Sequence, residues 1–186
     1  MSISTLKTGD IVLCSGRHFW FSDLIEIATH SPWSHCGVIY KDDTGVYLME
    51  SGLEHNQGKP VLGVQLTDFK LYTLTYDGEL WILPLNTLSQ TEEGELYSHF
   101  QQVLGKKYDT NPLDFLRAWF DLDVGNTTST DHFFCSALVA YLLNSIGVIQ
   151  SVKWDLIKPD DIQNLPLTQN YSYGPLWQLP TKDWFK

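Results

Sequence analysis

One apolar stretch decides the fold of this chain: His132-Phe133-Phe134-Cys135-Ser136-Ala137-Leu138-Val139-Ala140-Tyr141-Leu142-Leu143-Asn144-Ser145-Ile146. Apolar residues occupy every side of a helix drawn over these positions, and Gly147 follows as a typical helix end. A helix that is apolar all round belongs in the interior of a domain. We therefore predict a central buried helix over roughly His132 to Ile146, with Cys135 in its first turn.

The residues that precede this helix are rich in strand and turn signals. Two β-rich runs, Cys36–Tyr40 and Gly45–Glu50, flank the turn signal Lys41-Asp42-Asp43-Thr44-Gly45, a pattern that predicts a hairpin. Further short strands are expected at three places, namely Ile11–Leu13, Val61–Leu66 and Leu80–Leu83. The first half of the chain is therefore expected to build a sheet.

Three other segments carry helical patterns. Glu92–Leu104 has apolar residues at helical spacing and is closed by Gly105. Shorter helices are expected at Asp23–Thr29 and at Pro112–Phe120, the latter with proline in its first turn. Strands followed by helices indicate an α+β fold, and 186 residues suffice for one domain with its own core. We therefore expect one domain over residues 1–186.

Charge and cysteine content exclude some partners. The net charge is −10, and Lys106-Lys107 is the only adjacent basic pair, so neither nucleic acid nor an anionic lipid surface is an expected partner. No apolar run approaches the length of a membrane span, and the N-terminus lacks the apolar core of a signal peptide. The default expectation is a cytoplasmic protein without a stable membrane anchor, whose three cysteines are free thiols. Oligomeric state is not indicated.

Cys135 stands where a thiol becomes reactive. The partial positive charge at a helix N-terminus stabilises a thiolate, which is the nucleophilic form of cysteine, and free backbone N–H groups there can hold an oxyanion. The alternative interpretation is an ordinary core cysteine, because free cysteine is among the most buried residue types. Position alone does not separate the two.

His35 and Glu50 are candidates for the partners of that thiol. His35 begins the first arm of the predicted hairpin and can act as a base, and Glu50 ends the second arm, where it can orient the imidazole. Taken singly, each residue also fits a structural or solvent-exposed role. Cys36 follows His35 on a strand, so its side chain should point to the opposite face, away from the active site and into the core.

The other histidines and cysteines do not indicate a metal site. Short Cys-x-x-Cys or His-x-x-x-His spacing is absent, so we expect neither zinc nor another cofactor. The residues considered for zinc are Cys14, His18, His30, Cys36 and His55. Trp33, Trp20 and His18 are candidates for lining a cleft or for capping a hydrophobic edge.

A series of short motifs, read in order, resembles the permuted branch of the NlpC-like, papain-fold superfamily. Its members include YiiX-like proteins and, more distantly, lecithin–retinol acyltransferases. The matching stretches span nearly the whole chain: Thr8-Gly9-Asp10-Ile11-Val12-Leu13, Ser31-Pro32-Trp33-Ser34-His35-Cys36-Gly37-Val38, Leu48-Met49-Glu50-Ser51, Leu104-Gly105-Lys106-Lys107-Tyr108-Asp109, Phe134-Cys135-Ser136-Ala137-Leu138-Val139 and Lys158-Pro159-Asp160-Asp161-Ile162.

The resemblance implies a circularly permuted papain-like fold, in which an antiparallel sheet packs on a central helix that bears the catalytic cysteine. It implies Cys135 as the nucleophile, His35 as the base and Glu50 as the orienting acid. Tyr108 matches a tyrosine that lies beside the nucleophile and contacts the oxyanion or the substrate. Ala137 departs from the acidic residue that many YiiX-like relatives carry.

The expected activity is therefore that of a cysteine peptidase or amidase with a thioacyl intermediate and no cofactor. Two alternatives remain open: a lipid acyltransferase or thioesterase, and a binding protein that retains the fold without turnover. The substrate would be a peptide, an amide or an acyl ester, because a thiol–imidazole pair serves all three.

Overall fold

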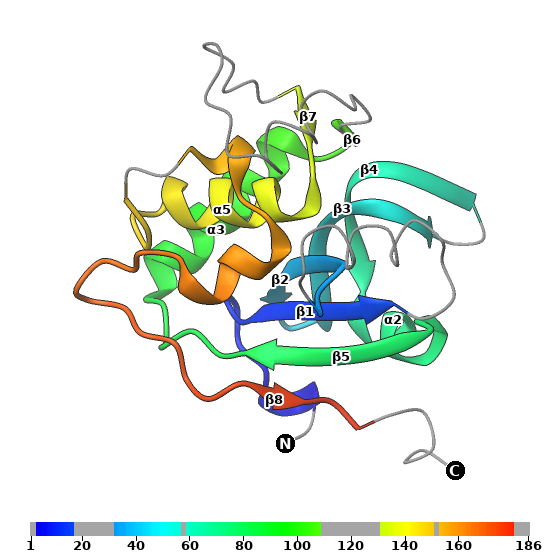
Figure 1. The fold of residues 1–186 in the computed structure, drawn as a ribbon, viewed down its shortest axis with the longest axis horizontal. Helices are drawn as coiled ribbons and strands as arrows, with labels where there is room; N and C mark the ends of the chain where they lie inside the picture. Colours follow the sequence, from blue (N-terminus) through cyan, green and yellow to red (C-terminus); the bar gives the residue numbers. More distant parts are fainter. Residues whose placement is uncertain (1–2, 17–31, 57–58, 109–130, 151–152, 181–186) are drawn as a thin grey trace.

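The computed structural model describes residues 3–16, 32–56, 59–108, 131–150 and 153–180. Within these residues a mainly antiparallel sheet has the strand order β7-β6-β4-β3-β2-β1-β5-β8, with β6 and β7 parallel (Figure 1). The strands are β1 (Ile11–Gly16), β2 (His35–Lys41), β3 (Val46–Asn56), β4 (Lys59–Asp68), β5 (Gly78–Leu83), β6 (Lys107–Tyr108), β7 (His132–Phe133) and β8 (Trp177–Gln178). The helices are α2 (Phe69–Thr75), α3 (Gln90–Val103) and α5 (Cys135–Ser145), with 3-10 turns η1 (Ile3–Thr5), η2 (Trp154–Leu156) and η3 (Pro159–Asn164).

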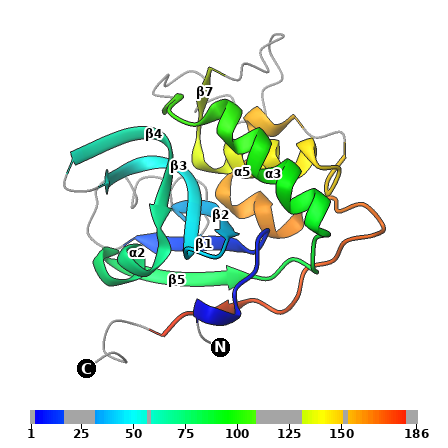
Figure 2. The same ribbon diagram turned by 180° about the vertical axis from the view of Figure 1, so that it is seen from behind.

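The sheet separates two apolar clusters because successive strand residues point to opposite faces. On one face Ile11 and Leu13 pack with α5 and α3, whereas on the other Val12 and Cys14 pack with Phe69 and Tyr72 of α2. Figures 1 and 2 show α3 and α5 together on one side, with α2 apart from them, where it connects β4 to β5. The α+β class expected from the sequence is confirmed.

The predicted strands are confirmed and extend beyond their expected limits. The hairpin between β2 and β3 closes with Lys41 opposite Val46, and this register places Gly37 opposite Glu50. The helix predicted at Glu92–Leu104 begins two residues earlier, at Gln90, because Ser89 and Glu92 form a capping box. The helix α2 and the short strands β6, β7 and β8 were not predicted.

The central helix begins later than the sequence pattern indicates. His132 and Phe133 form β7, which pairs with β6, and Phe134 is the extended N-cap residue of α5. The prediction of a helix from His132 is therefore wrong for three residues, because a strand partner distant in sequence overrides their local pattern. The helix is buried as expected, except at Tyr141, Asn144 and Ser145. The helices predicted at Asp23–Thr29 and Pro112–Phe120 lie outside the described residues.

No helix in the described ranges is both long enough and apolar enough to cross a membrane. All three cysteines are free and buried.

Candidate active site

The start of α5 is fixed by hydrogen bonds to other elements. The Ser51 hydroxyl on β3 donates to the Phe133 carbonyl at 2.7 Å, and the Ser136 hydroxyl donates to the Ile157 carbonyl at 2.5 Å. Cys135 lies between these two anchors as the first residue of the helix and is 4% exposed. A thiol at this position meets the partial positive charge of the helix N-terminus.

His35 and Glu50 form a direct pair. The distance between His35 Nε2 and Glu50 Oε2 is 2.8 Å, and the Glu50 side chain is fully buried. Their proximity at one end of the hairpin is confirmed. Gly52 makes room for the imidazole, because a Cβ added there would lie 3.0 Å from His35 Cε1.

Thr67 completes the environment of the carboxylate. Its hydroxyl donates to Glu50 Oε1 at 2.6 Å, so each oxygen of this buried carboxylate has a partner. Sequence reasoning missed Thr67, which lies on β4 two residues after Gln65, the residue opposite Glu50. Only the register of β3 and β4, with Leu48 opposite Thr67 and Glu50 opposite Gln65, identifies it.

Two residues of β2, His35 and Cys36, are the neighbours that shift the pKa of Cys135. The Cys36 thiol, the His35 imidazole and the Cys36 backbone N–H hold the pKa of Cys135 well below its usual range, although burial opposes this shift. Burial disfavours a charged His35, but hydrogen bonds to Cys135 and Glu50 outweigh that effect and raise its pKa well above the usual range. The two directions agree: the site favours a thiolate–imidazolium pair.

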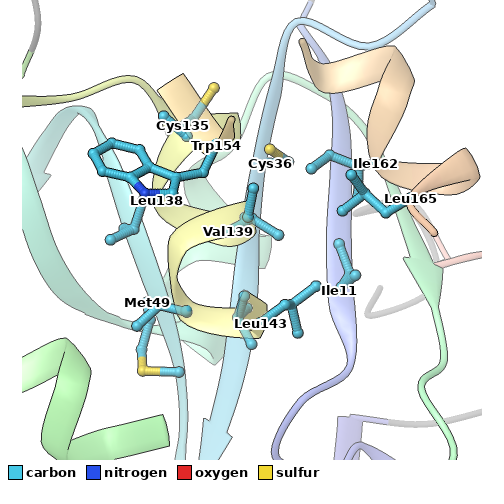
Figure 3. Close-up of a cluster of buried hydrophobic side chains, with 14 of the residues drawn as sticks. Ile11, Cys36, Met49, Cys135, Leu138, Val139, Leu143, Trp154, Ile162 and Leu165 are labelled. Carbon is cyan, nitrogen blue, oxygen red and sulfur yellow. The ribbon is translucent and has the colours of Figure 1, made fainter. Parts of the chain in front are cut away.

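Cys36 is in the core, as predicted, but the prediction that it points away from the active site is wrong. Its side chain is fully buried in the cluster that packs against α5, at the same end of the cluster as Cys135 (Figure 3). The reason is that α5 packs on the sheet face that Cys36 occupies, with its N-terminus beside the start of β2. Burial, and then contact with Cys135, raise the pKa of Cys36, so it remains a thiol.

The remaining predicted residues have distinct environments. Tyr108 on β6 packs edge-to-face on Phe134, the residue before Cys135, with ring centroids 5.9 Å apart. Trp33 is buried in the hydrophobic core and contacts Trp81 edge-on. Ala137 is buried in the same cluster. His18, Trp20, His30 and the His55 side chain lie outside the described residues.

Comparison with known proteins shows the fold. No family model matches the chain, and no curated protein matches it. The structure of the metalloprotein YiiX from Escherichia coli O157:H7 is similar, with 22% identity, a TM-score of 0.59, and coverage of 95% of this chain and 97% of that one. The chain therefore has a YiiX-like fold, as the sequence motifs indicated.

YiiX is described as a metalloprotein, which raises the question of whether the residues of this chain could hold a metal ion. Across the described ranges, no group of three or more His, Cys, Asp or Glu side chains has the arrangement to hold a metal ion. The described residues therefore do not fit a metal centre.

Proposed function

We propose that this chain is a cysteine hydrolase of the circularly permuted papain-like class, formed by one catalytic domain over residues 1–186, and that it cleaves peptide or amide bonds. The supporting observation is the 2.8 Å hydrogen bond between His35 and Glu50 beside Cys135, which begins a buried helix and whose pKa His35 lowers. The strand that carries the histidine precedes the cysteine helix in sequence, the reverse of the papain order.

The mechanism follows from these positions. The Cys135 thiolate attacks the carbonyl carbon, and backbone N–H groups at the start of α5 stabilise the oxyanion, with Tyr108 as a further contact. The His35 imidazolium gives its proton to the leaving amine as the C–N bond breaks, which leaves a thioester on Cys135. His35 then removes a proton from water, the hydroxide attacks the thioester, and the acid is released with the thiolate restored.

Glu50 holds the imidazole in one tautomer throughout this cycle. Because Glu50 Oε2 accepts from His35 Nε2, the other ring nitrogen, Nδ1, is the one that serves Cys135. A buried carboxylate with both oxygens occupied cannot easily rotate, so the ring keeps its orientation between the two proton transfers.

The decisive experiment is the rate of iodoacetamide labelling at each cysteine as a function of pH, in the wild type and in His35→Ala. We expect Cys135 to label rapidly at and below pH of about 6.5, and to lose this advantage in the variant. Cys14 is the internal control, because burial raises its pKa to about 12. Labelling of Cys135 no faster than that of a free thiol would exclude the proposed cysteine hydrolase activity.

A substrate panel then separates the chemical classes that share a thioacyl intermediate. Chromogenic peptide amides and fatty-acyl esters are compared with wild-type protein and Cys135→Ala. Turnover of amides that requires Cys135 supports the peptidase or amidase, whereas turnover of acyl esters alone would replace it by a thioesterase or acyltransferase. Rapid labelling without turnover of either class would favour the binding protein that retains the fold.

A further inference from the structure

A second thiol touches the proposed nucleophile. Cys36 is a neighbour of Cys135, and each of the two residues shifts the pKa of the other. Both side chains belong to one apolar cluster, and they lie at the same end of it where α5 begins (Figure 3). A hydrolase needs one nucleophilic thiol, so the Cys36 thiol forms and breaks no bond in the mechanism above.

The two thiols differ in access and in protonation. Cys135 retains 4% exposure, whereas Cys36 and Cys14 have none, so a small oxidant meets Cys135 first. The Cys135 pKa is lowered and the Cys36 pKa is raised, which makes Cys135 the thiolate of the pair. Peroxides react with thiolates rather than thiols.

We propose that Cys135 and Cys36 form a reversible disulfide on exposure to a hydroperoxide, with Cys36 as the resolving thiol, and that this bond switches the site off. The proposal concerns the regulation of the site described above and rests on the proposed function only in requiring a reactive Cys135. Its probe is hydrogen peroxide, and its reversal requires an external thiol reductant.

The chemistry balances in two steps. The Cys135 thiolate attacks one peroxide oxygen, the O–O bond breaks, and the leaving hydroxide takes the proton of the His35 imidazolium to become water; sulfur is oxidised to a sulfenic acid and the peroxide is reduced. The Cys36 thiol sulfur then attacks the Cys135 sulfur, the S–S bond forms, and the S–O bond breaks. The departing hydroxide takes the Cys36 proton as water, so two thiols and one peroxide give one disulfide and two waters.

The position of Cys36 suits this second step. The negative charge of Cys135 contributes to the raised pKa of Cys36, and that charge disappears once Cys135 becomes a sulfenic acid. The resolving thiol is then easier to ionise at the moment it must attack. Proximity supplies the rest, because a thiol held against its target reacts as an intramolecular partner. Cys14 lacks this arrangement, since its sulfur lies 3.7 Å from the Tyr72 hydroxyl on the other face of the sheet.

The test is peptide mass spectrometry of the full chain after equimolar hydrogen peroxide, with free thiols blocked by N-ethylmaleimide. We expect a cross-linked pair of peptides that contain Cys36 and Cys135, with an intact mass lower by about 2 Da. Dithiothreitol should remove the cross-link and restore rapid iodoacetamide labelling of Cys135. The Cys14→Ala variant should behave as the wild type.

The Cys36→Ala variant should instead accumulate sulfinic acid at Cys135, about 32 Da heavier, which dithiothreitol does not reverse. Cys36→Ser serves as a second variant if the alanine protein fails to fold. Sulfinic acid in the wild type, or a cross-link through Cys14, would overturn the proposal without changing the labelling of Cys135 measured before peroxide is added. Failure of the proposed function would appear separately, as slow iodoacetamide labelling of Cys135 in protein never exposed to peroxide.

Discussion

Thr67 donates a hydrogen bond of 2.6 Å to Glu50 Oε1, the carboxylate oxygen that the His35 imidazole leaves unoccupied. The two residues come from adjacent strands, and His35 comes from the next strand along the sheet. The orientation of the imidazole therefore depends on the pairing of β2, β3 and β4. This chain of contacts extends the proposed catalytic group from three residues to four.

Replacing Thr67 by valine tests that dependence. Thr67→Val keeps the shape of the side chain but leaves a buried carboxylate oxygen without its donor, which costs about 1–3 kcal/mol of unfolding free energy. We also expect slower labelling of Cys135 at neutral pH, because Glu50 gains freedom to turn away from His35. Urea unfolding and iodoacetamide labelling measure the two effects. The control is Thr75→Val on the exposed end of α2. Equal stability and equal labelling rates in the two variants would show that Thr67 does not support Glu50.

Glu50 is expected to set the tautomer of His35. In Glu50→Gln the side-chain amide can donate where the carboxylate accepted, so the ring loses the partner that keeps its proton on Nε2. Turnover should then fall by up to about 10⁴-fold, the loss caused by the equivalent change in a serine protease triad. Steady-state kinetics on the best amide substrate give the measurement. Glu95→Gln on the exposed surface of α3 is the control, and a comparable loss in both variants would contradict the role.

The dependence of stability on pH follows from the paired pKa shifts. The contribution of Cys135, whose pKa is lowered from 9.0, is complete above pH 9.0 and is lost as pH falls through the folded value. The contribution of His35, whose pKa is raised from 6.5, is complete below pH 6.5 and is lost as pH rises through the folded value. The two changes compensate between these limits, because folded and unfolded states then bind equal numbers of protons.

The free-energy difference between wild type and Cys135→Ala should therefore be flat from pH 6.5 to 9.0 and should decrease on both sides. Chemical unfolding across this range measures it. A difference that rises steadily with pH would mean that Cys135 is stabilised as a thiolate without a charged His35.

Sequence reasoning succeeded where the pattern was local. The apolar helix, the β2–β3 hairpin and the closeness of His35 to Glu50 were predicted because short-range signals specify them. The strand at His132 was missed because its partner, Lys107, is distant in sequence. Cys36 was assigned to the correct face, but the sequence could not show that the start of α5 lies on that face too.

Gly52 offers a test of packing around the base. Its φ is not in the left-handed region, so Gly52→Ala introduces little backbone strain, but the new Cβ would meet His35 Cε1 at 3.0 Å and Glu50 Oε2 at 3.7 Å. We expect the imidazole to shift away from Cys135, with labelling at neutral pH slowed by about tenfold or more, since misplacement on the order of 1 Å is costly in catalysis. The matched control is Gly94→Ala in α3, where a Cβ meets nothing within 4 Å; alanine there should stabilise the helix by about 0.5–1 kcal/mol and leave labelling unchanged. Unchanged labelling in Gly52→Ala as well would show that the ring tolerates displacement and that Glu50 alone sets its position.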